Sequence, residues 1–438
     1  MTQPLRPSAR RTWGDAALAV LAGFAAMTVL AAAGLAFAGA ADLPDGAYPR
    51  VVAAVVVMAA GGSVGVSGDA GFLADAHAVL SVLPLSVSLA GALAVGFRFL
   101  RPLRGRAVAA PGELLLRAAP LVVLWLAVLT GFAFAARHTF GVTVVPSPGR
   151  DDTGDLGDLG DLGQLGDLGQ LGDLGNILGA TPTVGFEAAV PATLLFGLLW
   201  ILGLLLITLL VSRRAPLPAR LVRFHEAVRP AAYATVVLLL AYVAIGAVVG
   251  LVAAVTRDRT PETLAVILLG LPNLAWLALT VGLGGAWEGR VQGPFGLPMP
   301  RLLDQVLRTP DGSTTTLDVR ALAEHDARAW WLVVLAAVLV LGTGFLAAVR
   351  SSARVRPWQH ALHLAVALAL AVLTVCLLGR IEARFGLSLL GIGEADALGG
   401  RVELRAVLWR TVGFALVWGA VAGFLGALLA RPLQRRRT

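Results

Sequence analysis

The sequence has no lysine and only one cysteine, and long stretches of it carry no charge. All 35 basic residues are therefore arginine, a bias that we attribute to genomic composition. The single cysteine, Cys376, excludes disulfide bonds within the chain and metal sites built from several cysteines. Charged residues make up only 14% of the chain, so the composition does not fit an ordinary soluble domain.

The chain is instead rich in apolar residues, which form 57% of its 438 positions. A helix needs about 20 apolar residues to cross a bilayer, and the chain offers many such runs. We therefore predict an all-α fold, a polytopic membrane helical bundle. Its first apolar run is too long for a cleaved signal peptide and is expected to be retained as a span. Eight runs are predicted to span: 15–39, 78–97, 118–136, 191–212, 230–256, 331–349, 360–379 and 411–430.

Two further apolar runs have features that break helices. Residues 51–66 form a short run that ends in glycines, and residues 264–284 carry Pro272 and Asn273 at their middle. We predict that both runs are re-entrant or broken helices that return to the outer side.

The distribution of arginine favours this topology, because basic residues concentrate in cytoplasmic loops. With re-entrant segments, the clusters at 98–106 and 213–223 lie inside, and most acidic residues lie outside. Both termini are then cytoplasmic, and the protein is expected in the plasma membrane as a multi-pass protein. A sequence pI near 11 could suggest nucleic acid, but the arginines flank apolar runs, so we expect no nucleic acid partner.

Short internal similarities predict a parallel duplication. FGVTV (140–144) resembles FGLSL (385–389), and FGLLW (196–200) resembles FALVW (414–418). Each half then has four crossings, so the halves share one orientation in the membrane. The predicted parts are a cytoplasmic N-terminus (1–14), a first repeat (15–212), a basic linker helix (213–229), a second repeat (230–430) and a basic tail (431–438).

The first repeat contains a low-complexity outer loop at 145–185, in which a Gly-polar-Leu triplet recurs from 154 to 175. Its lack of proline argues against collagen, and the aspartate spacing matches neither an EF-hand nor a nonapeptide calcium repeat. We interpret it as an outer spacer, with ion binding as the alternative.

No span carries an internal charge, so the interrupted segments become the candidates for a path across the membrane. Alternatively, their small residues and proline serve helix packing. The candidate path or packing residues are Gly61, Gly62, Ser63, Ser67, Asp69, Pro272, Asn273, Trp287, Glu288 and Arg290.

Acidic residues accompany histidine before a predicted span in each half, and such pairs could bind metal or respond to pH. The residues are Asp75 and His77, then Glu324, His325 and Asp326. Further ligands are missing, and polar residues at a membrane interface are ordinary, so we predict no metal site. We also predict no catalytic residues and no cofactor, because the sequence has no recognisable enzymatic motif.

Two connecting segments have possible binding roles. Residues 217–229 are predicted to form a short basic helix on anionic lipid, or simply a connection between the halves. Residues 293–331 contain prolines followed by a predicted amphipathic helix from Arg301 to Arg308, which could cap a path or receive a partner.

Several stretches resemble the streptophobe family of very hydrophobic actinobacterial membrane proteins. They are SGDAGFLAD (67–75), LPLSVSLAGAL (83–93), FLRPLR (99–104), APLPARLVRFHEAVRPAAYA (215–234), EGRVQGPFGLPMP (288–300), AEHDARAWWLVV (323–334) and RFGLSLLGIG (384–393). The triplet tract departs from this resemblance. The resemblance implies a membrane location and supplies no activity or site residue.

Two functions remain open at this point. The first is a permease or channel whose path lies between the two repeats, a hypothesis that rests on duplication and interrupted helices. The second is a non-transporting membrane scaffold that binds a partner in the cell envelope. A continuous polar cavity between the interrupted segments would favour transport, and a dry interface would favour the scaffold.

Overall fold

A computed structural model describes residues 9–43, 46–69, 74–101, 111–141, 183–212, 219–256, 260–292, 314–351, 355–389 and 400–435. Within these residues, eight helices are long and apolar enough to cross a membrane. The predicted polytopic helical bundle is therefore confirmed. It also carries an eight-stranded antiparallel sheet that our sequence analysis did not predict.

The first half of the chain alternates helices with pairs of strands. It begins with α1 (Ala9–Phe37), the short helix η1 (Ala40–Asp42) and α2 (Ala47–Ala59). The strands β1 (Val64–Asp69) and β2 (Ala74–Ser81) lead to α3 (Leu85–Leu100) and α4 (Pro111–Ala135). The strands β3 (Arg137–Gly141) and β4 (Thr183–Ala188) then lead to α6 (Val190–Val211).

The second half follows the same succession. It begins with α7 (Ala219–Thr256), α8 (Thr260–Gly282), β5 (Trp287–Gln292) and β6 (Thr315–Leu317). Two short helices, α10 (Val319–His325) and η4 (Ala327–Trp330), precede α11 (Trp331–Arg350) and α12 (Pro357–Leu378). The half ends with β7 (Ile381–Leu389), β8 (Gly400–Ala406) and α13 (Leu408–Arg435).

The sheet runs continuously through both halves in the order β3-β4-β1-β2-β7-β8-β5-β6. The first four strands and the last four occupy equivalent places, because β3 corresponds to β7, β4 to β8, β1 to β5 and β2 to β6 in the succession of elements. The halves meet where β2 pairs with β7 over eight residue pairs, from Ala74 opposite Leu389 to Ser81 opposite Glu382. The sheet therefore joins the two halves edge to edge.

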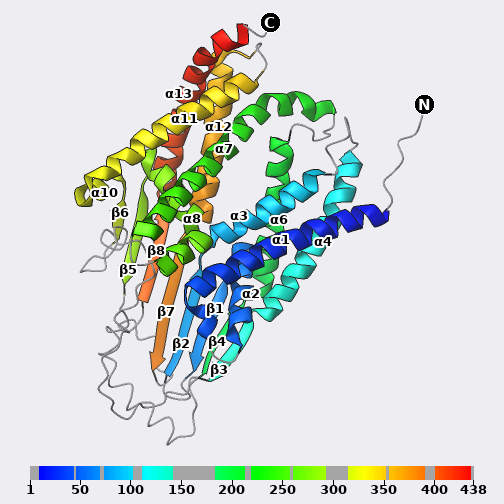
Figure 1. Ribbon diagram of the computed structural model, residues 1–438, viewed down its shortest axis with the longest axis vertical. Coiled ribbons are helices and arrows are strands. Elements are labelled where there is room, and N and C mark those ends of the chain that lie inside the picture. Colours follow the sequence, from blue (N-terminus) through cyan, green and yellow to red (C-terminus); the bar gives the residue numbers. More distant parts are fainter. Residues whose placement is uncertain are drawn as a thin grey trace, which may run out of the picture.

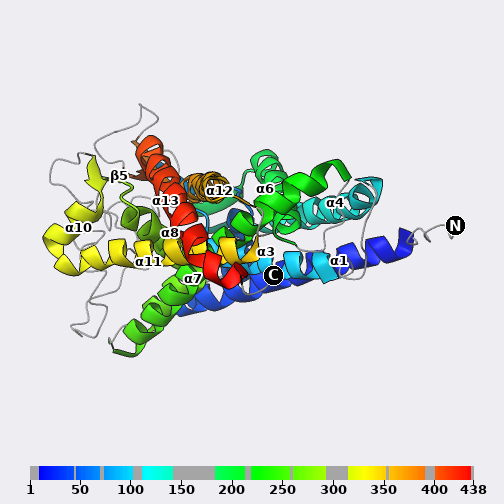
Figure 2. The same ribbon diagram turned by 90° about the horizontal axis from the view of Figure 1, so that it is seen from above.

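The helices gather on one side of the molecule and the strands extend from them (Figure 1). Both ends of the chain lie on the side of the bundle away from the strand tips. In the view from above, α4 and α10 lie toward opposite ends of the molecule (Figure 2). The two halves contact each other through α8, which packs on α1 and α3. Because lipid cannot satisfy the backbone groups of an open sheet edge, we place the sheet outside the hydrocarbon layer.

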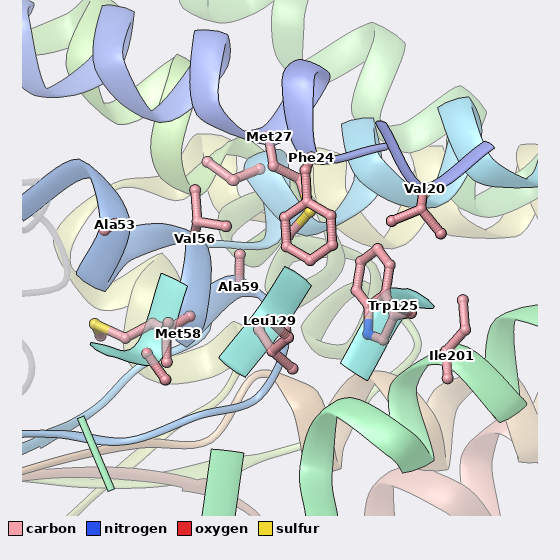
Figure 3. Packing of buried hydrophobic residues seen from close by; sticks show 14 of the residues in the cluster. Val20, Phe24, Met27, Ala53, Val56, Met58, Ala59, Trp125, Leu129 and Ile201 are labelled. Carbon is pink, nitrogen blue, oxygen red and sulfur yellow. The ribbon is translucent and has the colours of Figure 1, made fainter. Parts of the chain in front are cut away.

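The helices of the first half enclose an apolar core (Figure 3). Trp125 of α4 lies at its centre, stacked on Trp200 of α6 with ring centroids 4.5 Å apart and tilted against Phe24 of α1 at the same distance. Val56 and Ala59 of α2 are fully buried in this core. The short helix α2 is therefore part of the packed interior.

The second half has its own core, in which α13 packs closely on α11 and α12. A Cβ atom added to Gly419 would lie 2.6 Å from the Cα of Ala365, and one added to Gly423 would lie 2.6 Å from the carbonyl of His360. A Cβ added to Gly426 would lie 2.3 Å from the carbonyl carbon of Gly344. Small residues let membrane helices approach in this way, so these glycines bring the helix backbones together.

Two predictions about individual elements are wrong. The predicted span at 78–97 includes residues 78–81 of β2, and its helix begins only at Leu85. An apolar run reads continuously through a strand into a helix, and Pro84 was the unused signal of the boundary. Pro272 does not interrupt its segment either, because α8 continues through it to Gly282.

The basic segment at 217–229 is helical from Ala219, but it belongs to the 38-residue helix α7 and is no separate linker helix. Several other predictions lie outside the described residues. These are the triplet tract at 154–175, the helix predicted from Arg301 to Arg308 and the terminal residues 1–8 and 436–438.

Candidate functional site

The first candidate residues, Gly61, Gly62 and Ser63, lie between α2 and β1. At the end of α2, Gly61 has a φ of 96°, a conformation that glycine adopts without a steric penalty. The Gly62 N–H donates to Val57 O and the Gly61 N–H donates to Met58 O, which is the Schellman pattern of a helix end. A Cβ added to Gly62 would lie 2.7 Å from Thr193 Oγ1 of α6. These two glycines therefore close a helix against its neighbour.

The end of α8 repeats this arrangement. Gly284 also has a φ of 96°, and the Gly285 and Gly284 N–H groups donate to Thr280 O and Val281 O. A Cβ added to Gly285 would lie 2.7 Å from Cγ2 of Thr411, the residue of α13 that corresponds to Thr193 in α6. The two candidate segments thus end in the same turn against equivalent helices.

Asn273, which follows Pro272, joins α8 to the start of α3 by two hydrogen bonds. The Asn273 Oδ1 accepts a hydrogen bond from Leu85 N at 3.1 Å, and its Nδ2 donates to Leu83 O at 2.9 Å. Asn273 therefore caps a helix that has no side-chain cap of its own.

Ser86 enters the backbone of α8 one turn away. Its hydroxyl donates to Ile267 O at 2.9 Å and accepts from Leu271 N at 3.1 Å. The hydroxyl thus stands between two groups that would pair with each other in an uninterrupted helix, just before Pro272. The hydroxyl thus satisfies both groups where α8 opens next to Pro272. We call the four residues Ser86, Pro272, Asn273 and Leu85 the α3–α8 latch.

Trp287, Glu288 and Arg290 lie at the base of β5. Trp287 is 1% exposed, and its Nε1 donates to Thr280 Oγ1 at 2.9 Å. Glu288 lies opposite Arg405 in the ladder and forms an ion pair with it at 3.3 Å, while Arg290 lies opposite Glu403. Trp287 is thus a core residue, and the charged pair belongs to the sheet.

Ser63, Ser67 and Asp69 continue from the first glycine pair into β1. Ser63 O accepts from Ala189 N at 3.2 Å, and Ser67 is exposed opposite His77 in the ladder. Asp69 lies opposite Asp75 in the same register. The side chains of Asp69, Asp75 and His77 lie outside the described part.

The two predicted acid and histidine groups do not occupy equivalent elements. Asp75 and His77 lie in β2, whereas Glu324 and His325 end α10. Asp326 caps η4, since its Oδ1 accepts from Arg328 N at 2.9 Å. Glu324 and His325 are exposed, and His325 Nδ1 lies 3.0 Å from Ala321 O. Among the described residues, no group of three or more His, Cys, Asp or Glu is placed to hold a metal ion.

Several important contacts were missed by sequence reasoning. Ser86 and Ser88 are buried in α3, and Ser88 Oγ accepts from Trp200 Nε1 at 2.8 Å. Asp318 accepts from Arg320 N and Ala321 N at the start of α10 and forms an ion pair with Arg410 at 3.2 Å. Ser86 and Ser88 in an apolar run and the Asp318-Val-Arg sequence before a helix were the available signals.

Tryptophans mark the two levels at which helices leave the lipid. Trp331 and Trp409 are 71% and 80% exposed at the sheet ends of α11 and α13. Trp13 and Trp358 are exposed at the opposite ends of α1 and α12. Such belts are typical of bilayer interfaces. At a rise of about 1.5 Å per residue, a 20-residue helix such as α11 is about as long as the hydrocarbon layer is thick.

Apolar side chains fill the interior between the candidate segments. Leu269 of α8 packs against the first core, where α1 separates α8 from α2. The buried polar residues in the described parts of the bundle are serine, threonine and His360, with no buried acid or arginine. Two small pockets lie at the end away from the sheet, one between α1, α3 and α4 and one between α6, α7 and α11.

In this structure the helices pack closely through apolar side chains, hydrogen bonds between α3 and α8 join the two halves, and the sheet extends beyond the helices. No family model, curated protein or solved structure matches the chain.

Proposed function

We propose that the protein is a non-transporting scaffold of the cell envelope, in which the helical bundle anchors the sheet at the membrane surface and the sheet binds a partner. One observation carries this proposal. The sheet is continuous through both halves and extends beyond the helices, while the bundle below it is filled with apolar side chains. A path for polar solutes between the candidate segments has no support from that packing, so the scaffold hypothesis is favoured over a permease.

The proposal includes a parallel duplication. It is supported by the repeated succession of elements, by the repeated strand order and by the matching turns at Gly61 and Gly284. The hydrogen bonds from Ala189 N to Ser63 O and from Val407 N to Ala286 O are also equivalent. Membership of the streptophobe family remains part of the proposal and rests on the sequence stretches quoted above.

The proposed orientation places the sheet outside the cell and both termini in the cytoplasm. Exposed arginines at the end away from the sheet support it, among them Arg98, Arg101 and Arg356. In this topology the continuous helix α8 lies along the outer side and does not cross the membrane. Thr260 contacts Ala254 at the end of α7, and Gly282 meets Leu332 at the start of α11, so both ends of α8 lie toward the sheet.

Labelling of single cysteines tests the orientation. In a Cys376→Ala background, Arg320→Cys and Arg405→Cys should react with an impermeant maleimide in intact cells. Arg101→Cys and Arg356→Cys should react only after the membrane is opened. Labelling of Arg101→Cys from outside would overturn the topology, because the sheet would then face the cytoplasm.

Reconstitution tests the absence of transport. Proteoliposomes that contain the purified protein should release trapped potassium, protons and small organic anions no faster than vesicles without protein. A saturable flux that scales with the amount of protein would contradict the scaffold and favour the permease. Partner binding is tested by placing a photo-crosslinking residue at the exposed Ser67 of β1, with Leu195, a lipid-facing position of α6, as the matched control.

A further inference from the structure

The serine hydroxyl of the α3–α8 latch lies between two groups of α8 that are able to pair with each other. Ser86 Oγ donates to Ile267 O at 2.9 Å and accepts from Leu271 N at 3.1 Å. In a regular α-helix, each N–H donates to the carbonyl four residues earlier, so Leu271 N and Ile267 O are natural partners. If the hydroxyl withdrew, α8 would satisfy both groups by closing its own hydrogen bond.

The start of α3 also has a second source of hydrogen-bond partners. In the structure, Leu85 N and Leu83 O are bonded to the side chain of Asn273. These groups directly follow β2, a strand of the sheet that we place outside the hydrocarbon layer. The first N–H groups of a helix have no partner within it, and water commonly satisfies them. Water at the membrane surface can therefore replace Asn273 when the start of α3 moves away.

The other contacts between the halves differ in whether they must break when the latch opens. α8 packs on α1 and α3, and Leu85 is buried in the second core. Lipid chains are as apolar as leucine, so they can replace such contacts at little cost. The ladder of eight residue pairs between β2 and β7 lies outside the lipid and can stay intact. The halves can therefore part at α8 and remain joined at the sheet, with residues 82–84 as the pivot between β2 and α3.

We propose that the α3–α8 latch is a conformational device with two states. In the closed state, Ser86 and Asn273 join α3 to α8 as in the structure. In the open state, Ile267 and Leu271 pair with each other, and the start of α3 leaves α8. The pairing of β2 with β7 holds the halves together in both states. A contact with two satisfied arrangements lets packed elements move as discrete units. This inference does not depend on a partner for the sheet.

Amide hydrogen exchange reports the two states residue by residue. The full-length protein is placed in lipid nanodiscs, and exchange is read by mass spectrometry with electron-transfer fragmentation. In Ser86→Ala the closed state loses one joint, so the Leu85 amide should exchange at least about fivefold faster. The Leu271 amide should keep its wild-type rate, because it then pairs with Ile267 O. Thr343→Ala removes a hydroxyl that bonds within its own helix and should change neither rate.

A disulfide between α1 and α8 tests the open state with Ser86 in place. A Cβ added to Gly34 would lie 2.7 Å from Cγ of Leu269, so cysteines at these two positions would meet. In a Cys376→Ala background, oxidised Gly34→Cys/Leu269→Cys should hold the latch closed. Exchange at Leu85 should then be at least about fivefold slower than in the reduced protein. This comparison remains decisive even if Ser86→Ala does not fold.

A disulfide across the sheet is the matched control for this lock. Ser81→Cys/Glu382→Cys joins β2 to β7, which stay paired in both states, so its oxidation should leave Leu85 exchange unchanged. If this bond slowed Leu85 as much as the lock does, the start of α3 would move only when the sheet opens. That result would overturn the proposal.

Two further results would overturn the two-state latch. The first is an equal rise in exchange at Leu271 and Leu85 in Ser86→Ala, because the hydroxyl would then have no substitute in α8. The second is an unchanged Leu85 rate after the Gly34 and Leu269 cysteines are oxidised, because the start of α3 would then never leave α8.

Discussion

The α3–α8 latch is the most informative contact at the scale of single residues. Asn273 and Ser86 come from different halves of the chain, yet each satisfies backbone groups of the other's helix. Leaving such groups unpaired costs about 1–3 kcal/mol where water is absent. The latch therefore stabilises the joint between the halves as well as the two helices.

We expect Asn273→Ala to lower the free energy of unfolding by about 1–3 kcal/mol, because it leaves Leu85 N and Leu83 O without partners. Ser86→Ala should lower it too, and the double variant should lose less than the sum, since both side chains fasten the same pair of helices. Denaturation in mixed detergent micelles measures these values. Thr256→Ala removes an exposed hydroxyl and should stay within about 0.5 kcal/mol of wild type. If the double variant lost the full sum of the two single losses in the free energy of unfolding, Asn273 and Ser86 would act independently, and the latch would not be a single unit.

The paired helix ends supply a second prediction at this scale. Gly61→Ala and Gly284→Ala should each lower the free energy of unfolding by about 1–2 kcal/mol, because alanine is strained in the left-handed conformation. Gly131→Ala is the control, since a Cβ there meets nothing within 4 Å. Thermal unfolding in detergent is the measurement, and equal Tm values for Gly131→Ala and Gly284→Ala would contradict the proposed role.

At the scale of elements, the joint between β2 and β7 unites the halves. Ser81 lies opposite Glu382 in this ladder, and both side chains are half-buried. Directly opposed residues on antiparallel strands have Cβ atoms about 5 Å apart, close to the separation in a disulfide.

In a Cys376→Ala background, Ser81→Cys/Glu382→Cys should therefore form a disulfide on mild oxidation. Ser81→Cys/Ala383→Cys should not, because Ala383 is opposite Leu80 and projects from the other face of the sheet. Mass spectrometry of unreduced peptides identifies the bond. A disulfide only in the second variant would mean that the register is shifted by one residue.

Hydropathy predicted most of the helices but not the sheet. Long apolar runs such as those of α6 and α12 are recognised because only a helix of that length can satisfy its backbone in lipid. The strands are short, and several continue directly into apolar helices, as β2 does through Val82 and Leu83 into α3. Pro272 was misread because α8 continues through it, and the polar contacts on either side of it come from α3, which is far away in sequence. The glycine pairs were identified, but their packing role follows only from the facing Thr193 and Thr411.

At the scale of the whole molecule, equivalent strands have connections of very different length. Residues 142–182 join β3 to β4, whereas residues 390–399 join β7 to β8. Ten residues, 390–399, are therefore long enough to connect two paired strands in this arrangement.

Replacing residues 142–182 with the sequence of 390–399 should therefore preserve the fold. A shorter loop costs less entropy to close, so we expect stability to stay the same or to rise by about 1 kcal/mol. Unfolding in detergent and the Ser81–Glu382 disulfide test both report the result. Loss of that disulfide in the shortened protein would show that the longer connection is needed for the joint.

The order of the strands gives the molecule two unlike ends. In the middle of the sheet, β2 pairs with β7. The outermost strand β6 has the place in the second half that β2 has in the first, and the outermost strand β3 has the place in the first half that β7 has in the second. A contact between unlike partners leaves one unmatched surface at each end, so a third unit could in principle follow the second. The edge strand β6, however, has three residues, whereas β2 has eight, and α10 begins two residues after β6 ends. So few backbone groups are a poor template for another strand. The short edge strand β6 therefore disfavours the pairing of a further strand at this end of the sheet.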